Sequence, residues 1–193
     1  DLHTKVTSHL STINELNNKK YGLFFYYIMM QCSNKYIGSE DALKIQNEAI
    51  NLIKACNKAK DAGFTLSCMV ILGIGGKKYS KENAIETGKV ISASKPDYVG
   101  ALTLYLENGI KEEFITKWKG EFVRVSDQEA LEELELLVSN INAEDKIVFR
   151  ANHGSNAYNI AGTFPEDKQE MLDKINWLTQ HPENARPQGL RGF

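Results

Sequence analysis

TLSCMVILGIGG, residues 65 to 76, is the stretch that decides the fold of this chain. Its first eight residues are mostly apolar, without the strict polar alternation of a strand that faces water on one side. Such a run is typical of a strand in a parallel sheet that is covered by helices. The glycines that follow predict a tight turn from the carboxyl end of this strand into a helix.

Outward from this stretch, apolar runs alternate with segments of helical spacing. Three more strands are expected, at residues 23–30, 98–106 and 146–151. Apolar residues three and four positions apart predict helices at 9–19, 39–62, 84–95, 126–141 and 163–178. Ser126 with Glu129, and Thr163 with Glu166, form the pattern of a capping box at two of the helix starts. The residues after Pro182 are expected to be irregular.

Helices that connect strands of this type predict an α/β fold with a parallel sheet, either doubly wound or part of a (βα) barrel. Ligands of such sheets bind beyond the carboxyl ends of the strands, so the residues after each strand are the candidate site. All four such segments are polar or rich in glycine, and they are Gln31–Ser33, Gly73–Gly76, Thr103–Asn108 and Arg150–Asn156. We expect them to meet at one edge of the sheet.

Individual motifs leave alternatives open. The glycines of LGIGG suit either close approach of a ligand to the backbone or a plain tight turn. Arg150 suits an anion clamp or a partner for a buried acid, and a structural role for His153 is favoured over a metal site. The Glu-rich stretch Glu129–Glu135 is interpreted as the solvated face of a helix.

Composition limits the functions and the cellular locations that fit this chain. The chain has 193 residues, 42% of them hydrophobic, and a formal net charge of −2 with dispersed lysines, so nucleic-acid binding is not predicted. Three cysteines without metal-binding spacing favour a reducing compartment, and we expect the cytoplasm. The apolar run 21–30 is too short to span a bilayer, and no secretory signal opens the sequence. Because the chain starts at Asp1, we expect it to be a fragment.

Several blocks, taken together, resemble the carboxyl-terminal half of the radical S-adenosylmethionine enzymes, in the group of uncharacterised proteins related to oxygen-independent coproporphyrinogen oxidases and Elongator-type enzymes. The resemblance runs from about residue 8 to 193. The blocks that carry it are YGLFFYYIMMQCS (21–33), KAKDAG (58–63) with MVILGIGG (69–76), PDYVGALTLYLENG (96–109), FRANHGSN (149–156) with GTFPEDK (162–168), and RPQGLRGF (186–193).

The resemblance implies a TIM-like fold, the carboxyl-terminal half of a parallel (βα)6 barrel over residues 1–181, with an irregular tail at 182–193. It implies an iron-sulfur, oxidoreductase-like enzyme in which a four-iron four-sulfur cluster and S-adenosylmethionine generate a radical that abstracts hydrogen. By position, the residues implied to bind S-adenosylmethionine are Gln31, Ser33, Ile71, Gly73, Gly75, Gly76, Leu102, Thr103 and Leu104. The residues implied to form the substrate pocket are Arg150, Asn152, His153, Ser155 and Asn156.

This sequence also departs from the family pattern. The cluster motif CxxxCxxC is absent from the 193 residues, and Gln31 stands where the family has Glu. We therefore expect the chain alone to hold no metal and to be inactive in radical chemistry. Two other hypotheses stay open: a non-catalytic nucleoside-binding or partner module, and an α/β enzyme that binds a phosphate ligand at LGIGG. The partner expected is a small molecule, with self-association through an exposed sheet edge and no membrane binding.

Overall fold

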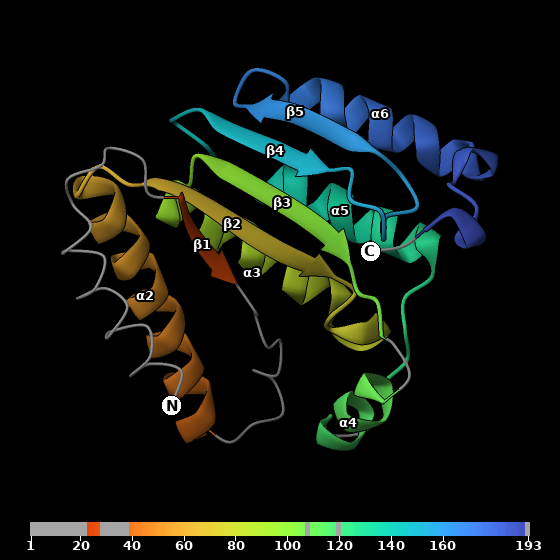
Figure 1. The fold of residues 1–193 in the computed structure, drawn as a ribbon, viewed down its shortest axis with the longest axis horizontal. Helices are drawn as coiled ribbons and strands as arrows, with labels where there is room; N and C mark the ends of the chain where they lie inside the picture. The colour runs from red at the N-terminus through yellow and green to blue at the C-terminus, as the bar shows by residue number, and fades with distance from the viewer. Residues whose placement is uncertain (1–22, 28–38, 107–108, 119–120, 192–193) are drawn as a thin grey trace.

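A five-stranded sheet forms the centre of the computed structural model, which describes residues 23–27, 39–106, 109–118 and 121–191 (Figure 1). For 23–27, 39–48 and Lys117 it describes the backbone element alone. The strands follow one another in space in the order of the sequence, β1-β2-β3-β4-β5. The pairs β1–β2, β2–β3 and β3–β4 are parallel, and β4–β5 is antiparallel. The expected α/β class with a mostly parallel sheet is confirmed.

The strand bounds agree closely with the apolar runs. The strands are β1 (Leu23–Tyr27), β2 (Thr65–Leu72), β3 (Tyr98–Thr103), β4 (Ile147–Ala151) and β5 (Ile160–Phe164). The first strand was expected to reach residue 30, but residues 28–30 lie outside the described part. The third was expected to reach Leu106, three residues beyond its observed end.

The expectation of a helix from Thr163 was wrong, because this residue belongs to β5. Its backbone N–H donates to the side chain of Asp167, and α6 (Lys168–Gln180) begins after that residue. The central Ala161-Gly162 pair conceals the strand, since neither residue favours a sheet by propensity. Strand pairing with β4, from Ile147 opposite Phe164 to Ala151 opposite Ile160, overrides this local preference.

Of three other helices, the first and the last agree with their predicted ranges, and the middle one begins at residue 76 rather than at the predicted residue 84. They are α2 (Ser39–Asp61), α3 (Gly76–Ser94) and α5 (Asp127–Asn140). The capping box at Ser126 is confirmed, since its side chain accepts from the N–H of Glu129 at 3.2 Å. The periodicity did not predict the short helix α4 (Ile110–Lys117). The expected helix at 9–19 lies outside the described residues.

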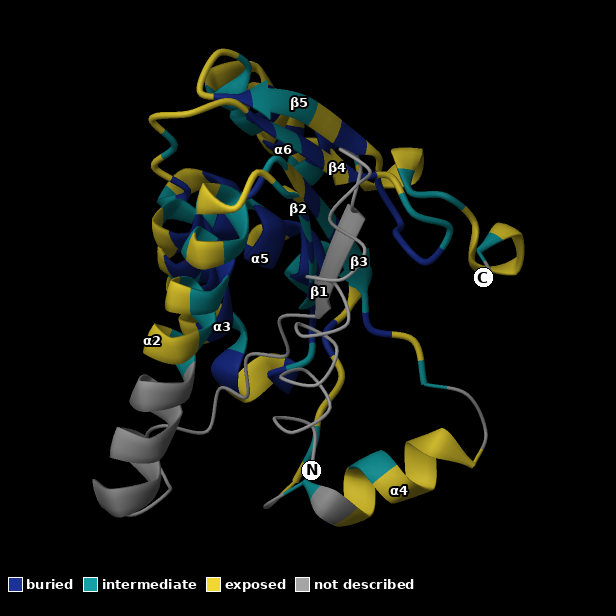
Figure 2. Cartoon of the chain, turned by 60° about the vertical axis from the view of Figure 1, so that its left-hand side comes forward, coloured by how far each residue is buried: buried dark blue, intermediate teal, exposed yellow. Residues whose placement is uncertain are grey.

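The helices α2, α3, α5 and α6 lie on one face of the sheet (Figures 1 and 2). On β2 the side chains toward this face are buried, from Leu66 to Leu72, while the intervening ones are half-buried. A single hydrophobic core therefore fills the space between sheet and helices, with Phe149 and Phe164 in edge-to-face contact at its centre. The opposite face, called the open face below, carries residues such as Met69 and Ile71.

Beyond the carboxyl ends of β2 and β3, α4 projects from the body of the molecule (Figure 1). The expected irregular tail contains two short 3₁₀ turns, η1 (Pro182–Asn184) and η2 (Gln188–Leu190). Within the described residues, no helix combines the length and apolar content that crossing a bilayer demands.

Candidate functional site

The segments after β2, β3 and β4 meet at the carboxyl edge of the sheet. The backbone N–H of Leu104 donates to the carbonyl of Leu72 at 2.9 Å, which continues the β2–β3 ladder beyond Thr103. Asn156 brings in the segment after β4, because its Oδ1 accepts from the N–H of Thr103 at 2.7 Å. Three of the four predicted segments therefore lie together, and the fourth, with Gln31 and Ser33, lies outside the described residues.

Asn156 is a buried clamp rather than a free ligand group. Its Oδ1 also accepts from the hydroxyl of Thr103 at 3.1 Å, and its Nδ2 donates to the carbonyl of Ala101 at 2.8 Å. Only 3% of the residue is exposed. Because both ends of the amide are occupied by β3, the side chain fixes the loop after β4 to the end of that strand.

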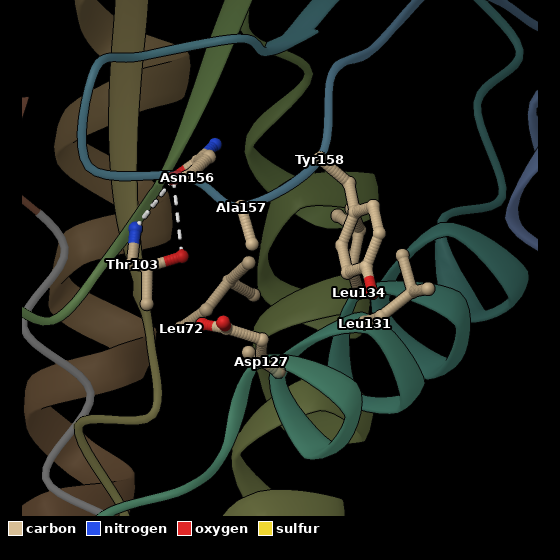
Figure 3. Close-up of a pocket in the computed structure, with 9 residues that line it drawn as sticks. Leu72, Thr103, Asp127, Leu131, Leu134, Asn156, Ala157 and Tyr158 are labelled. Carbon is tan, nitrogen blue, oxygen red and sulfur yellow. Dashed lines mark hydrogen bonds between the residues drawn. The ribbon is translucent and has the colours of Figure 1, made fainter. Parts of the chain in front are cut away.

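A small pocket lies beside this clamp, on the helix side of the sheet edge. Its volume is about 10 Å³, enough for about one water molecule. Figure 3 shows Thr103 and Asn156 on one side of it, with Tyr158, Leu131 and Leu134 on the other. The residues that line this edge pocket are Leu72, Thr103, Asp127, Ala130, Leu131, Leu134, Asn156, Ala157 and Tyr158.

Charge in the edge pocket comes from Asp127, in the first turn of α5. Both of its carboxylate oxygens accept from the guanidinium of Arg191, at 2.6 and 2.8 Å. Burial raises the pKa of the Tyr158 phenol, Asp127 raises it further, and Arg191 opposes both effects. The edge pocket is thus mostly apolar, and its wall includes the Asp127 carboxylate, which is paired with Arg191, and the Tyr158 phenol.

The glycine loop after β2 is covered by the chain itself. Gly73 has a φ of 78°, and a Cβ at this residue would lie 2.6 Å from Cγ2 of Val125. At Gly76 a Cβ would lie 2.9 Å from the carbonyl oxygen of Val123. The backbone that approaches these glycines closely is therefore the segment before α5. These contacts favour the tight-turn interpretation of LGIGG over the ligand-cradle interpretation.

Hydrogen bonds within this loop also favour the tight-turn interpretation. The N–H of Gly76 donates to the carbonyl of Gly73 at 3.0 Å, and that of Lys77 donates to Val123 at 2.8 Å. Gly75 accepts from the N–H of Tyr79. The loop donors at Gly73, Gly76 and Lys77 therefore have partners within the chain.

Glu133 is the partner of Gly73, and it corrects the interpretation of Glu129–Glu135 as a solvated face. The side chain is buried, with 1% of the residue exposed. Its carboxylate accepts from the N–H of Gly73 at 3.0 Å, from Nδ2 of Asn83 at 2.8 Å, and from the hydroxyl of Ser80. Burial raises the pKa of Glu133, and the three hydrogen bonds oppose this shift only in part.

The loop after β4 holds the predicted substrate residues in different surroundings. His153 Nδ1 lies 3.0 Å from the hydroxyl of Ser155 and accepts from the N–H of that residue at 3.2 Å. Asn152 is exposed. Arg150 lies within β4, and its guanidinium donates to the backbone carbonyls of Phe149 and Gly162, so neither of these two partners is an acid.

Ile71 and Leu102 lie next to each other in the parallel register of β2 and β3, both half-buried. Along each strand they alternate with the residues of the core, which places them on the open face. Thr103 and Leu104 belong instead to the edge itself, where Leu104 is buried. The described residues among those predicted to bind the cofactor are therefore divided among the open face, the glycine loop and the sheet edge.

Aromatic side chains join α4 to the glycine loop. Trp118 lies 5.7 Å from Phe114 and 5.0 Å from Phe122 between ring centroids, and 6.3 Å from Tyr79 of α3. Phe122 directly precedes the segment that covers Gly73 and Gly76. This aromatic cluster therefore holds in place the segment before α5, which packs on the glycine loop.

Sequence reasoning missed four residues of this edge: Asp127, Glu133, Tyr158 and Arg191. Glu133 could have been found, because Ala130, Leu134 and Leu137 place it on the apolar stripe of α5. Asp127 follows the capping Ser126 and was treated only as part of a helix start. No local pattern points to Tyr158 or Arg191, whose positions depend on contacts between distant segments.

Comparison with protein-family models, with curated proteins and with solved structures gives no match for this chain. The site is therefore interpreted from its own residues and geometry.

Proposed function

We propose that this chain is the carboxyl-terminal half of a radical S-adenosylmethionine type (βα) barrel, and that its sheet edge binds an adenosyl group. The supporting observation is the winding of the chain. Among the described residues, parallel strands β1 to β4 follow in sequence order, and the helices between them lie on one face (Figure 1). A (βα) barrel is wound in this way, whereas a doubly wound sheet reverses its strand order and has helices on both faces.

In this proposal the open face corresponds to the interior of the barrel. Ile71 and Leu102, side by side near the carboxyl ends of their strands, offer two apolar side chains to the flat face of adenine. Gln31 and Ser33, which follow β1 in the sequence and lie outside the described residues, are proposed to bind the ribose or the methionyl part. His153 and Asn152, in the loop after β4, are proposed to border the substrate side.

A four-iron four-sulfur cluster does not fit the residues of this chain. Such a cluster takes thiolates from several cysteines, and the chain has Cys32, Cys56 and Cys68. Cys56 and Cys68 are buried in the hydrophobic core between α2 and β2, away from the carboxyl edge. We therefore propose a nucleoside-binding module without radical chemistry of its own, in a reducing compartment such as the cytoplasm.

The alternative of a phosphate ligand at LGIGG is not favoured. The side chain of Glu133 already accepts from the N–H of Gly73 at 3.0 Å, so this backbone donor is not free for a phosphate group. Gly76 and Lys77 also donate within the chain. The cation that follows the loop, Lys77, is already paired with Glu129 at 2.7 Å.

Isothermal titration calorimetry tests the proposal with S-adenosylmethionine, S-adenosylhomocysteine, ATP and inorganic phosphate. We expect both adenosyl compounds to bind with a Kd of roughly 1 to 100 μM, and phosphate not to bind. Leu102→Gln should weaken this binding about tenfold, because it places a polar amide against the base. Ala161→Gln, on exposed β5, is the matched control and should bind as the parent does.

Two results would reject the proposal. Binding of phosphate or ATP without a preference for adenosyl compounds would support the phosphate alternative. Absence of binding at millimolar concentration would exclude a nucleoside site in this chain. Sedimentation of the same samples would test whether the edge of β1, paired in the described structure with β2 alone, causes self-association.

A further inference from the structure

Residues 182–191, called the strap below, contact the loop after β4 through two arginines. The guanidinium of Arg186 donates to the carbonyls of His153 and Gly154, at 3.3 and 3.2 Å, and to Oδ1 of Asn159 at 3.0 Å. Its backbone N–H donates to the carbonyl of Ala157 at 2.7 Å. The partners in these four contacts extend along the loop from His153 to Asn159.

Arg191 fixes the strap to the rest of the protein. Its Nε donates to the carbonyl of Arg186 at 2.8 Å, and its two terminal nitrogens bind both oxygens of Asp127. This paired geometry is the strongest arrangement of arginine with a carboxylate. Only 14% of the Arg191 side chain is exposed. The strap thus connects the first turn of α5 to the loop after β4.

The edge pocket lies between those same two segments. Asp127 comes from α5, and Asn156, Ala157 and Tyr158 come from the loop. Two independent fastenings hold the loop in place: the Asn156 clamp to β3 and the strap. Arg186 adds contacts to residues on both sides of Asn156, from His153 to Asn159.

We propose that Arg186 and Arg191 are positioning residues that form a latch, and that release of this latch opens the edge pocket. Release separates Arg191 from Asp127, so the pocket gains a free carboxylate together with an accessible Tyr158. The latch acts on the loop that carries His153 and Asn152. This inference concerns the chain by itself and does not depend on adenosyl binding.

Hydrogen exchange measured residue by residue tests the latch in the full chain. We expect Arg191→Gln and Arg186→Gln to speed exchange of the amides of 153–159 about three- to tenfold. Exchange in β2 and β3 should not change. Lys77→Gln is the matched control, because it removes the 2.7 Å ion pair to Glu129 in the same first turn of α5 without touching the strap.

The titration of Tyr158 adds a readout that separates opening from simple loss of charge. Arg191 lowers the pKa of Tyr158, so its removal from a closed pocket would raise that pKa. Burial raises the pKa of Tyr158 by more than Arg191 lowers it. Opening the pocket to water would therefore lower this pKa toward the ordinary value of a tyrosine. The absorbance titration of the parent minus that of Tyr158→Phe isolates this phenol in each background.

The latch is supported if both arginine variants speed exchange in the loop and Arg191→Gln lowers the pKa of Tyr158. It is rejected if loop exchange equals that of Lys77→Gln, or if the pKa of Tyr158 rises. If a variant unfolds, exchange rises in β2 and β3 as well; Arg191→Lys, which keeps one contact to Asp127, then gives the deciding comparison. Loop exchange that is faster in Arg191→Lys than in the parent and in Lys77→Gln supports the latch, and exchange equal to the parent rejects it.

Discussion

The carboxylate of Glu133 accepts a hydrogen bond from the backbone N–H of Gly73, 60 positions earlier in the chain, at 3.0 Å. This contact joins the helix layer to the turn that follows β2. It also places an ionisable group where 1% of its residue is exposed. Folding stability should therefore depend on the protonation of this one side chain.

Glu133→Gln should change the pH dependence of the free energy of unfolding. Because burial raises the pKa of Glu133 in the folded state, the folded protein binds its proton more tightly than the unfolded chain does. The stability of the parent relative to the variant should therefore fall as pH rises from the ordinary carboxyl pKa through the raised one. The fall amounts to about 1.4 kcal/mol per pH unit within that window.

Urea unfolding of both proteins at several pH values measures this difference. Glu132→Gln, at the exposed neighbouring position, is the control and should stay within about 0.5 kcal/mol of the parent at each pH. A difference between parent and Glu133→Gln that is constant with pH would contradict the prediction.

Asn156→Ala should destabilise the protein by about 1 to 3 kcal/mol, because it leaves the N–H of Thr103 and the carbonyl of Ala101 without their partner. Asn152→Ala, exposed in the same loop, should change stability by less than about 0.5 kcal/mol. Thermal unfolding followed by circular dichroism compares the two. Equal effects of the two substitutions would show that Asn156 is no clamp.

Gly73→Ala should cost more than Gly63→Ala, although both glycines have a positive φ, 78° and 82°. A Cβ at Gly63 meets nothing within 4 Å, so that variant should lose only about 1 kcal/mol from backbone strain. A Cβ at Gly73 overlaps Val125, which adds a steric cost. In denaturant titrations, adding Val125→Ala to Gly73→Ala should recover part of the difference. No recovery would mean that the overlap with Val125 is not the cause.

Cys56 and Cys68 should resist alkylation in the folded protein. Both are buried, and a hydrogen bond with Cys56 together with burial raises the pKa of the Cys68 thiol well above its usual range. The same hydrogen bond lowers the pKa of Cys56, so burial is what protects that thiol. Since the thiolate is the reactive form, labelling with iodoacetamide should be about a hundredfold slower than in urea. Peptide mass spectrometry assigns the modified residues. Fast labelling of either cysteine in the native protein would place it outside the core.

The parallel part of the fold was predictable because its strands are apolar runs bounded by glycine, proline or a capping serine. The run Thr65–Leu72 matches β2 at both ends, and Ser126 begins α5 as its capping pattern requires. β5 was missed because its centre, Ala161-Gly162, has no strand preference. Helix α4 was missed because its support comes from aromatic residues outside it, among them Phe122.

The site was predictable only in outline. The carboxyl ends of the strands do meet, as parallel pairing requires, and this follows from the order of elements alone. The hydrogen-bond partners of individual side chains could not be predicted from the order of elements. Arg150 binds backbone carbonyls of β4 and β5, and Glu133 is buried although glutamates surround it. Such pairings depend on separations of 12 to 60 positions, which local patterns do not record.

The reversed direction of β5 limits how the sheet can be enlarged. β5 pairs with the outer edge of β4, so within the described strands a further strand that continues the parallel order would have to pair with β1. The two margins of the described sheet therefore differ in polarity: an added strand extends the parallel order at β1, but at β5 it meets a strand that runs against that order.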